Sequence, residues 1–557
     1  MATALWVRTI RHHRMDRQAV EPCLREDPQE ALAEACHKLD ISRPLWLDKN
    51  QREWDEFGQT RFLPDAFMEP VPFERLEIEF IDPDAKKRRS QDPRNAEYKE
   101  VFWMQEIIGQ LIDSYRNDLI AALEKWIAIP SVKAEPAPGA PFGTEVRRML
   151  DAAMADAQAM GFAVRDVDGY ACDITLGDAP EAVAVLGHLD VVPAGDSWQT
   201  PPFTATREGD RIYGRGTSDD KGPSLAALFA MRAIREAGVP LKKSIRLILG
   251  CDEESGWEDM AYYCAHADMP EVGFSPDASF PVINTEKAML HAAIHAPLSA
   301  EGLQVKQLWT GERLNVIPGE SKALLAGGDE LAARVTAYAE KTGLPYTAEV
   351  TDEGVWVTAE GIPGHSAYPE GRRNAIGMML LLLKALGVQG ALLTLANAVG
   401  MEHDGASLGC ACQDEVSGPL TCNMGILHLK DGALTATLDM RCPVSADLDE
   451  LEAAAQAHLP GFTMADVEKK PAHHVPADSE LVSSLLAAYH EETGLEPRAM
   501  STGGGTYAKV LRQGVAFGAS FPDDEDLAHQ AGEYATISGL LKAAKVYANA
   551  LVRLCAV

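Results

Sequence analysis

Apolar residues between about residue 104 and residue 286 form short runs that alternate with helical patterns. Two of the runs are almost continuously apolar, as strands are in a sheet covered on both faces: AVAVLGHLD and SIRLILGCDEE. A helix is predicted between them by the spacing of apolar residues in KGPSLAALFAMRAIREAG, which ends at Gly238. A strand, a helix and a strand in this order predict an α/β domain with a mostly parallel sheet.

The pattern loosens between Lys287 and His474, where apolar and polar residues alternate more, as in ALTATLDMRCP. Two strongly helical stretches lie in the same region, NAIGMMLLLLKALG and DLDELEAAAQAHL. From SELVSSLLAAYHEETG to Val557 the α/β character returns. We therefore expect one α/β domain made of residues 104–286 and 475–557, interrupted by an α+β domain at residues 287–474.

The first 98 residues differ from the rest of the chain. They contain an amphipathic helix candidate, DPQEALAEACHKLDI, and an alternating stretch that predicts a half-exposed strand, RLEIEFID. A polar, charged stretch with two prolines follows and predicts a linker, PDAKKRRSQDPRNAEYKE. We expect residues 1–98 to form an N-terminal extension.

Composition narrows the class of protein. The chain of 557 residues is 46% hydrophobic and 24% charged, as ordinary globular proteins are. Its net charge of -32 argues against binding to nucleic acid, which needs a basic surface. Its ten scattered cysteines, with no signal-peptide pattern, favour a cytoplasmic protein with reduced thiols. The longest apolar run, from Ala375 to Leu383, is too short to span a membrane.

Acidic and histidine residues gather where the predicted strands end. His188 and Asp190 end the first strand, and residues two apart in a strand point to the same side. Glu253 and Glu254 end the next strand, although adjacent carboxylates repel each other. Because doubly wound sheets bind ligands at the carboxyl ends of their strands, we expect three residues of adjoining loops and helix starts to join them: Asp219, Asp277 and His529.

Two histidines and several carboxylates are the ligands that divalent metal ions take, zinc first and manganese or cobalt next. Two such cations would supply the positive charge that Glu253 and Glu254 need. The spacing of Cys410 and Cys412 also suits a metal, but no second cysteine pair has zinc-ribbon spacing. The sequence therefore predicts a site for two divalent ions built from histidine and carboxylate.

Six motifs occur in the order found in the co-catalytic zinc peptidase family: GHLDVVPAGDSWQTPPF, YGRGTSDDKGP, LGCDEESG, PDASFP, GHSAYPEGRRNAI and AHQAGEY. The chain resembles this family, which includes acetylornithine deacetylase, succinyl-diaminopimelate desuccinylase, carboxypeptidase G and the carnosinases. The segments most similar to the peptidase V-type dipeptidases are DDKGP, PDASFP and STGGGTYAK. The resemblance runs from Met104, which could itself be a start codon, to Val557. It implies a zinc-peptidase-like catalytic domain, interrupted by a lid domain.

The resemblance also implies how two metal ions would be held. One ion would be bound by His188, Asp219 and Asp277. The second would be bound by Glu254 and His529, with Asp219 bridging the two ions. The ions expected from the resemblance are zinc, with manganese or cobalt as alternatives.

Two other acidic residues have different implied roles. Glu253 would be the general base that takes a proton from the attacking water and passes it to the leaving amine. Asp190 would fix the tautomer of His188. The family pattern also implies a cis peptide bond between Asp219 and Asp220.

The lid domain supplies most of the implied substrate contacts. His365 would stabilise the oxyanion, and Arg441 would bind the substrate carboxylate, with Arg372 and Arg373 as alternatives. The segment GRRNAI has one residue more than the family's usual pattern. Further contacts would come from Asn315, Gly503, Gly504 and Gly505.

The implied activity is hydrolysis of the amide bond of dipeptides that have a free C-terminal carboxylate. An N-acyl amino acid deacylase on the same scaffold is the alternative, and a non-catalytic binding protein is disfavoured because every expected ligand is present. We expect a small peptide as the partner, no nucleic acid, no membrane, and a monomer or homodimer. The family does not account for residues 1–98, which are either a fused small domain with its own partner or an upstream reading frame joined to the enzyme's.

Overall fold

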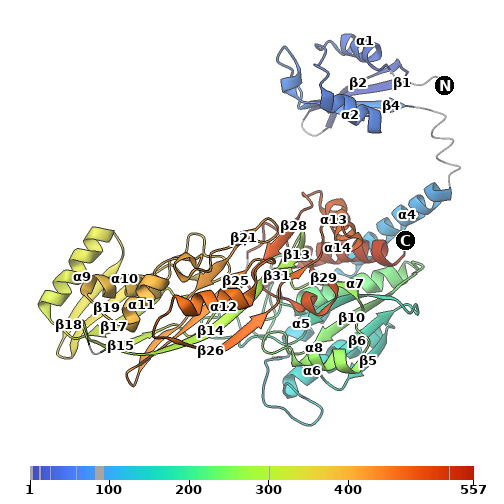
Figure 1. Cartoon of the computed structure of the whole chain (residues 1–557). Coiled ribbons are helices and arrows are strands. Elements are labelled where there is room, and N and C mark those ends of the chain that lie inside the picture. Colours follow the sequence, from blue (N-terminus) through green and yellow to red (C-terminus); the bar gives the residue numbers. More distant parts are fainter. Residues whose placement is uncertain are drawn as a thin grey trace. The chain divides into compact units, whose positions relative to one another are not determined.

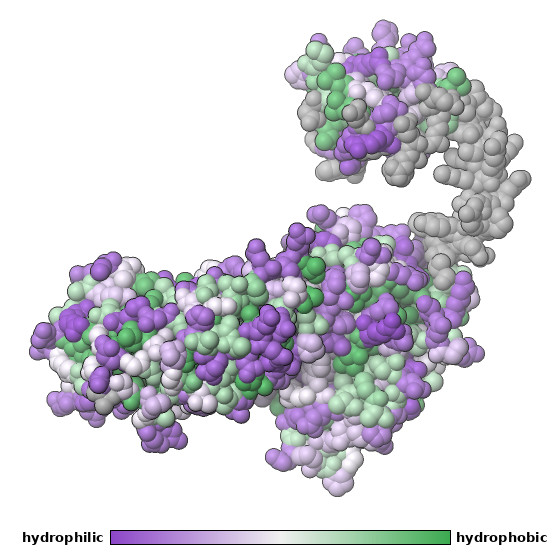
Figure 2. All heavy atoms as spheres, viewed as in Figure 1, coloured by the Kyte–Doolittle hydropathy of each residue, from purple (hydrophilic) through white to green (hydrophobic). Residues whose placement is uncertain are grey.

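The computed structural model describes residues 4–11, 14–24, 27–57, 59–81, 93–299, 301–525 and 527–556. The chain divides into two compact units, Met1–Glu106 and Ile107–Val557 (Figure 1). Hydrophilic residues are spread over the visible face of each unit, with hydrophobic residues between them (Figure 2). Among the described residues, no helix is both long enough and apolar enough to cross a membrane.

The N-terminal unit is a four-stranded antiparallel sheet with two helices, and its strands lie in the order β2-β1-β4-β3. Its elements are β1 (Ala4–Arg11), β2 (Arg14–Pro22), α1 (Gln29–Leu39), α2 (Asp48–Phe57), β3 (Gln59–Phe62), the 3-10 helix η1 (Pro64–Ala66) and β4 (Arg75–Ile81). Leu5, Val7 and Leu76 of the sheet are buried in one cluster with Leu32 of α1 and Trp54 of α2. The helix and strand predicted here are confirmed as α1 and β4.

The predicted linker is wrong in its second part. Helix α4 (Pro93–Ser114) begins inside it, so the residues from Pro93 onward are helical. A proline suits the first turn of a helix, because the N–H group that it lacks would have no partner there. The first part of the predicted linker, residues 83–92, lies outside the described residues.

The second unit contains a nine-stranded sheet in the order β27-β13-β29-β11-β7-β10-β6-β5, with β28 paired to β13. Its strands are β5 (Ala163–Val167), β6 (Ala171–Leu176), β7 (Ala182–His188), β10 (Ser244–Gly250), β11 (Val272–Ser275), β13 (Val282–Glu286), β27 (His473–His474), β28 (Ala499–Thr502) and β29 (Gln513–Ala516). The central strands β10, β7, β11 and β29 are parallel to one another. The β5–β6 hairpin and the pairs β6–β10, β13–β27 and β13–β29 are antiparallel, so the sheet is mixed rather than mostly parallel.

Helices cover this sheet, and we call residues 107–286 and 473–556 the main domain. Helices α7 (Lys221–Glu236) and α14 (Ile537–Cys555) pack on β7 and β10, and α6 (Thr144–Ala159) and α8 (Glu258–His266) pack on β6. The helix predicted between the two buried strands is confirmed as α7. The remaining elements are α5 (Arg116–Ile127), β8 (Thr206–Glu208), β9 (Arg211–Tyr213), β12 (Ala278–Ser279), α13 (Glu480–Thr493), η3 (Tyr507–Val510), β30 (Ala519–Ser520) and β31 (Tyr534–Thr536).

Residues 288–470, which we call the inserted domain, form an antiparallel sheet in the order β18-β19-β17-β15-β24-β25-β14-β26, with β23 paired to β25 (Figure 1). Its strands are β14 (Ala288–Pro297), β15 (Val305–Thr310), β16 (Val316–Ile317), β17 (Glu320–Leu325), β18 (Tyr346–Thr351), β19 (Gly354–Glu360), β20 (Gly364–His365), β21 (Gln413–Asp414), β22 (Gly418–Pro419), β23 (Thr421–Asn423), β24 (Leu427–Lys430), β25 (Ala433–Cys442) and β26 (Thr463–Lys470). Its helices are α9 (Asp329–Thr342), α10 (Ala375–Leu386), α11 (Ala391–Ala398), η2 (Ala406–Leu408) and α12 (Leu448–Ala457). The two predicted helices are confirmed as α10 and α12, and the side chains of Asn374 and Asp447 cap their first turns.

Candidate metal centre

Three parallel strands of the main domain bring acidic and histidine residues to one edge of the sheet. Strand β7 ends at His188, β10 ends shortly before Glu253, and β11 ends two residues before Asp277. Because β10, β7 and β11 are parallel neighbours, their carboxyl ends meet at the same edge. Asp219 comes from the start of α7, and His529 comes from the loop between β30 and β31.

His188 is buried, and its two ring nitrogens face different carboxylates. Its Nε2 lies 3.1 Å from Oδ1 of Asp219 and 3.6 Å from Oδ2 of Asp277. Its Nδ1 lies 3.0 Å from the backbone oxygen of Asp190 and 3.4 Å from Oδ1 of the same residue. Since Asp190 can accept the Nδ1 proton, the lone pair of Nε2 faces Asp219 and Asp277 and is free to bind a metal.

Asp219 contacts both histidines. Its Oδ1 faces His188, and its Oδ2 lies 3.0 Å from Nε2 of His529. The same Nε2 of His529 lies 2.9 Å from Oε2 of Glu254. The peptide bond between Asp219 and Asp220 is cis, as the resemblance implied. The Asp219 carboxylate therefore lies between two positions for a cation, one beside each histidine.

Glu253 and Glu254 are held in place through their backbone. The N–H of Glu253 donates to Oδ1 of Asp190 over 3.2 Å, and the N–H of Glu254 donates to Oδ2 over 3.1 Å. The preceding Asp252 is buried and pairs with Nζ of Lys133 at 2.6 Å. These contacts fix the backbone of the two glutamates and leave their carboxylates available to face the histidines.

Six residues form what we call the His–carboxylate cluster: His188, Asp219, Glu253, Glu254, Asp277 and His529. One ligand atom of each member lies within 4.8 Å of the others in two sets of three, His188–Glu253–Asp277 and His188–Asp219–Glu254. Imidazole nitrogen and carboxylate oxygen at this spacing fit zinc, manganese or cobalt. Among the described residues, neither of the sets with metal-ligand spacing includes Cys410 or Cys412.

Burial and like charges shift the pKa values of the cluster. Burial and the nearby Asp277 raise the pKa of Glu253 well above its usual range, and burial and Asp219 raise the pKa of Glu254 to about 7. Hydrogen bonds to Asp219 and Glu254 raise the pKa of His529 to about 11. Divalent cations would displace these protons, because a cation favours the deprotonated forms of carboxyl and imidazole groups.

The inserted domain places the predicted substrate residues Asn315 and His365 side by side. Val316 of β16 pairs with His365 of β20, and the N–H of Ser366 donates to the backbone oxygen of Asn315 over 3.0 Å. His365 is exposed, and its Nδ1 accepts a hydrogen bond from the N–H of Ala367 over 3.1 Å. These contacts lie within the inserted domain and not in the His–carboxylate cluster.

Arg441 is buried, and most of its guanidinium is already engaged. Its Nε and Nη2 contact the two carboxylate oxygens of Asp439 at 2.9 Å and 3.1 Å, and its Nη1 donates to the backbone oxygen of Gly503 over 2.9 Å. Gly503 permits a close approach of the two domains, because a Cβ at this position would lie 2.7 Å from Cβ of Ala367. Arg441 thus joins the inserted domain to the glycine-rich segment Gly503, Gly504 and Gly505.

Reasoning from the sequence missed two buried carboxylates that hold the cluster from behind. Asp259 of α8 accepts the N–H groups of Cys251 and Asp252 at 2.6 Å and 2.9 Å, and also accepts the hydroxyl of Tyr507. Burial raises the pKa of Asp259 to about 6. Glu533 accepts hydrogen bonds from the loop that leads into α7. Its position in the motif AHQAGEY was the signal in the sequence that could have found it.

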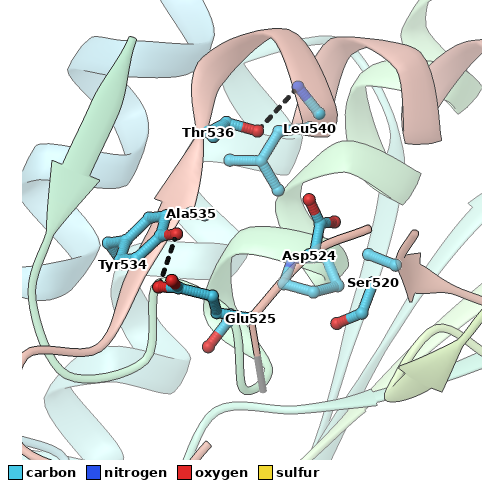
Figure 3. Close-up of a pocket in the computed structure, with 11 residues that line it drawn as sticks. Ser520, Asp524, Glu525, Tyr534, Ala535, Thr536 and Leu540 are labelled. Atoms are coloured by element: carbon cyan, nitrogen blue, oxygen red, sulfur yellow. Dashed lines mark hydrogen bonds between the residues drawn. The ribbon is translucent and has the colours of Figure 1, made fainter. Parts of the chain in front are cut away.

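A small pocket lies beside the cluster, next to Ser218 (Figure 3). The hydroxyl of Tyr534 donates to Oε2 of Glu525 over 3.1 Å and so closes the base of the loop that carries His529 (Figure 3). The residues that line the pocket, all of them described, include no member of the His–carboxylate cluster. The pocket is therefore a neighbour of the candidate site and not a part of it.

The fold and the cluster together define a class of protein. Two histidines and four carboxylates at the carboxyl ends of parallel strands are typical of hydrolases that use two divalent metal ions. Residues 184–553 match the family described as Peptidase family M20/M25/M40, and the chain belongs to this family. The resemblance identified from the six motifs is thereby confirmed.

Curated relatives match this chain over almost their whole length. The chain is 34% identical over 469 residues to "Putative dipeptidase YtjP" of Bacillus subtilis (strain 168), which covers 81% of this chain and 99% of the relative. It is 32% identical over 466 residues to "Putative dipeptidase SSP1012" of Staphylococcus saprophyticus, which covers 80% of this chain and 98% of the relative.

Two solved structures share the fold at low sequence identity. Human carnosine dipeptidase 1 is 16% identical, and the dipeptidase Dug1p of Saccharomyces cerevisiae is 15% identical. Each matches with a TM-score of 0.50 and covers 81% of this chain and 98% of its own chain. At these identities the likeness shows the fold alone.

Proposed function

We propose that this protein is a metal-dependent dipeptidase, which hydrolyses the amide bond of dipeptides that have a free C-terminal carboxylate. The observation that carries the proposal is the position of Asp219, whose carboxylate oxygens lie 3.1 Å from Nε2 of His188 and 3.0 Å from Nε2 of His529. A carboxylate shared in this way suits two cations that act on one water molecule and one amide. The names of the two curated relatives support dipeptides as the substrate class.

Each histidine belongs to one cation position in this proposal. His188 and Asp277 hold the first ion, Glu254 and His529 hold the second, and Asp219 bridges them. Zinc suits these ligands best, and manganese and cobalt are compatible with them. When bound, the two ions polarise the amide carbonyl and lower the pKa of a water molecule.

Glu253 is the proton-transfer group. Its carboxylate lies within 4.8 Å of the ligand atoms of His188 and Asp277, where an attacking water would be held. Burial and Asp277 raise the pKa of Glu253, which lets its carboxylate take a proton from that water and return it to the leaving amine. Asp190 keeps the Nδ1 proton of His188, so that Nε2 stays unprotonated.

The inserted domain serves as the lid and contributes the substrate contacts. Arg441 faces the substrate carboxylate, and His365 donates to the developing oxyanion with Asn315 beside it. Backbone groups of the glycine-rich segment complete the substrate site: Gly503, Gly504 and Gly505. Because the described contacts of His365 lie within the inserted domain, this residue reaches the substrate as the lid closes.

The domain boundaries and the location of the protein form part of the same proposal. The catalytic domain is built from residues 104–286 and 475–557, and the lid from residues 287–474. A cytoplasmic location is supported by the ten cysteines, all of which are free thiols.

Hydrolysis by the purified full-length protein, loaded with zinc, tests the proposed function. We expect release of amino acids from dipeptides and none from acetylated amino acids. Release from acetylated amino acids alone would replace the proposal with an N-acyl amino acid deacylase, and hydrolysis of neither would refute both.

Two matched variants test the role of Glu253. We expect Glu253→Gln to lose about 100- to 10,000-fold in kcat, because it cannot accept the proton, while it still binds zinc. The control is Glu258→Gln, at an exposed glutamate of α8, which should keep full activity. Full activity in Glu253→Gln would show that another group moves the proton.

A further inference from the structure

Glu533 is a fully buried carboxylate four residues after His529 in the chain. Its charge partner is Arg215, also buried, whose Nη1 donates to Oε2 of Glu533 over 2.6 Å. Taking two charges out of water is costly, and buried ion pairs often stabilise a protein no more than apolar replacements do. Stability alone therefore does not explain why a charge lies at this position.

The other oxygen of Glu533 organises the loop that carries Asp219. Oε1 accepts hydrogen bonds from the backbone N–H groups of Gly216 (3.0 Å), Ser218 (2.9 Å) and Asp219 (3.3 Å), and from Oγ of Ser218 (3.1 Å). The backbone oxygen of Glu533 accepts the N–H of Gly214 over 3.0 Å. All of these donors suit a carboxylate, which can only accept hydrogen bonds.

Glu533 therefore connects two segments that are 314 residues apart at Asp219. One segment carries Asp219, which lies between the two histidines, and the other carries His529. The Oδ2 atom of Asp219 lies 3.0 Å from Nε2 of His529, and metal sites tolerate errors of only about 0.2 Å in ligand distances. Fixing the loop against the His529 segment thus fixes the geometry that a cation between them would need.

We propose that Glu533 is a positioning residue for the metal centre, and that it sets the affinity for the second cation by locking the Asp219 loop against the His529 segment. The inference rests on the proposed two-metal centre. Glu533 contacts the backbone of Asp219 and the loop before it, so it acts through geometry and not as a ligand. The second cation is the one held by Asp219, Glu254 and His529.

Zinc titration of the metal-free, full-length protein in competition with a chromogenic chelator tests the proposal, because it resolves two affinities. In Glu533→Gln an amide NH₂ replaces one oxygen and faces donors that it cannot accept from. We expect the affinity for the second zinc ion to fall by about 10- to 100-fold. The matched control is Asp173→Asn, a buried carboxylate of β6 that pairs with Arg165 at 2.6 Å, which should bind both ions as the wild type does.

Excess zinc provides a readout that a general folding defect would not produce. Because the loss is one of affinity, added zinc should restore kcat in Glu533→Gln while KM stays at its wild-type value. Wild-type zinc affinity in this variant, or a loss of kcat that zinc does not restore, would overturn the proposal. If Glu533→Gln does not fold, Ser218→Ala decides, since it removes only one hydrogen bond to Oε1. We expect it to bind the second ion about fivefold more weakly, and unchanged binding would overturn the proposal.

This result can be told apart from the test of the proposed function. Wild-type protein that binds two zinc ions but hydrolyses no dipeptide would refute the dipeptidase and leave the role of Glu533 intact. Wild-type protein that hydrolyses dipeptides, with a Glu533→Gln variant that binds zinc equally well, would refute the role of Glu533 and leave the dipeptidase intact.

Discussion

Replacing Asp190 with asparagine should weaken the whole His–carboxylate cluster, because Asp190 holds three of its members at once. Its two carboxylate oxygens accept the N–H groups of Glu253 and Glu254 at 3.2 Å and 3.1 Å. Its Oδ1 also lies 3.4 Å from Nδ1 of His188. Asp190 is 1% exposed, so water cannot replace a lost partner.

The size of the effect follows from these contacts. Asparagine keeps one oxygen and turns the other into NH₂, so one of the two backbone N–H groups must face a donor in either orientation of the amide. A hydrogen bond to a charged acceptor contributes about 1.5–3 kcal/mol, which corresponds to about 10- to 150-fold in an equilibrium constant. We expect zinc affinity to fall by an amount in this range in Asp190→Asn.

Calorimetric titration of zinc into the metal-free protein measures this loss, and thermal unfolding of the same sample reports any general loss of structure. Asp173→Asn is the control, because Asp173 is also buried in the sheet but pairs with Arg165 and lies outside the cluster. A zinc affinity of Asp190→Asn within about twofold of the wild type would refute the reasoning, since the contacts would then not position the ligands.

Stability of the metal-free protein should fall as the pH rises from about 6.5 toward about 11, because the folded state raises the pKa of His529 to about 11 and keeps a proton that the unfolded chain releases. Scanning calorimetry checks the sign: Tm should decrease with pH, and less steeply in His529→Gln, whereas a rising Tm would contradict the argument. Arg441→Ala should lower the free energy of unfolding in urea by about 3–5 kcal/mol by leaving the buried Asp439 unpaired. The exposed pair of Arg512 is the control, and Arg512→Ala should cost less than about 1 kcal/mol; equal losses would rule out a special role for the buried pair. Trp54→Ala should destabilise the N-terminal unit by about 3–5 kcal/mol and leave dipeptide hydrolysis unchanged, since Trp54 lies in the core of that unit; lost hydrolysis would tie the unit to the active site.

Local patterns predicted those features of the fold that depend on neighbours in the chain. The apolar spacing in KGPSLAALFAMRAIREAG predicted α7, which runs from Lys221 to Glu236. The continuous apolar runs predicted β7 and β10, which are buried along nearly all of their length. The direction of a strand follows from its sequence, so the carboxyl ends with His188 and Glu253 could be placed at one edge of the sheet.

Features that depend on distant contacts were predicted less well. The sheet is mixed because the β5–β6 hairpin and the returning strands β27, β28 and β29 add to the parallel centre, and no local pattern indicates which strands become neighbours. The stretch around Pro93 was interpreted as a linker, because a proline both interrupts structure and begins helices. Only the surrounding chain decides between these two outcomes.

The sequence by itself determined the chemical inventory of this protein. The order and spacing of its motifs identified the peptidase family, and the residue types identified histidines and carboxylates as metal ligands. The tertiary structure alone decided how they meet: Asp219 lies between two histidines, Asp190 holds the backbone of the glutamate pair, and Glu533 holds the Asp219 loop. The reason is that hydrogen bonds and shared ligands depend on distance in space between segments hundreds of residues apart, which the local periodicity of the sequence does not specify.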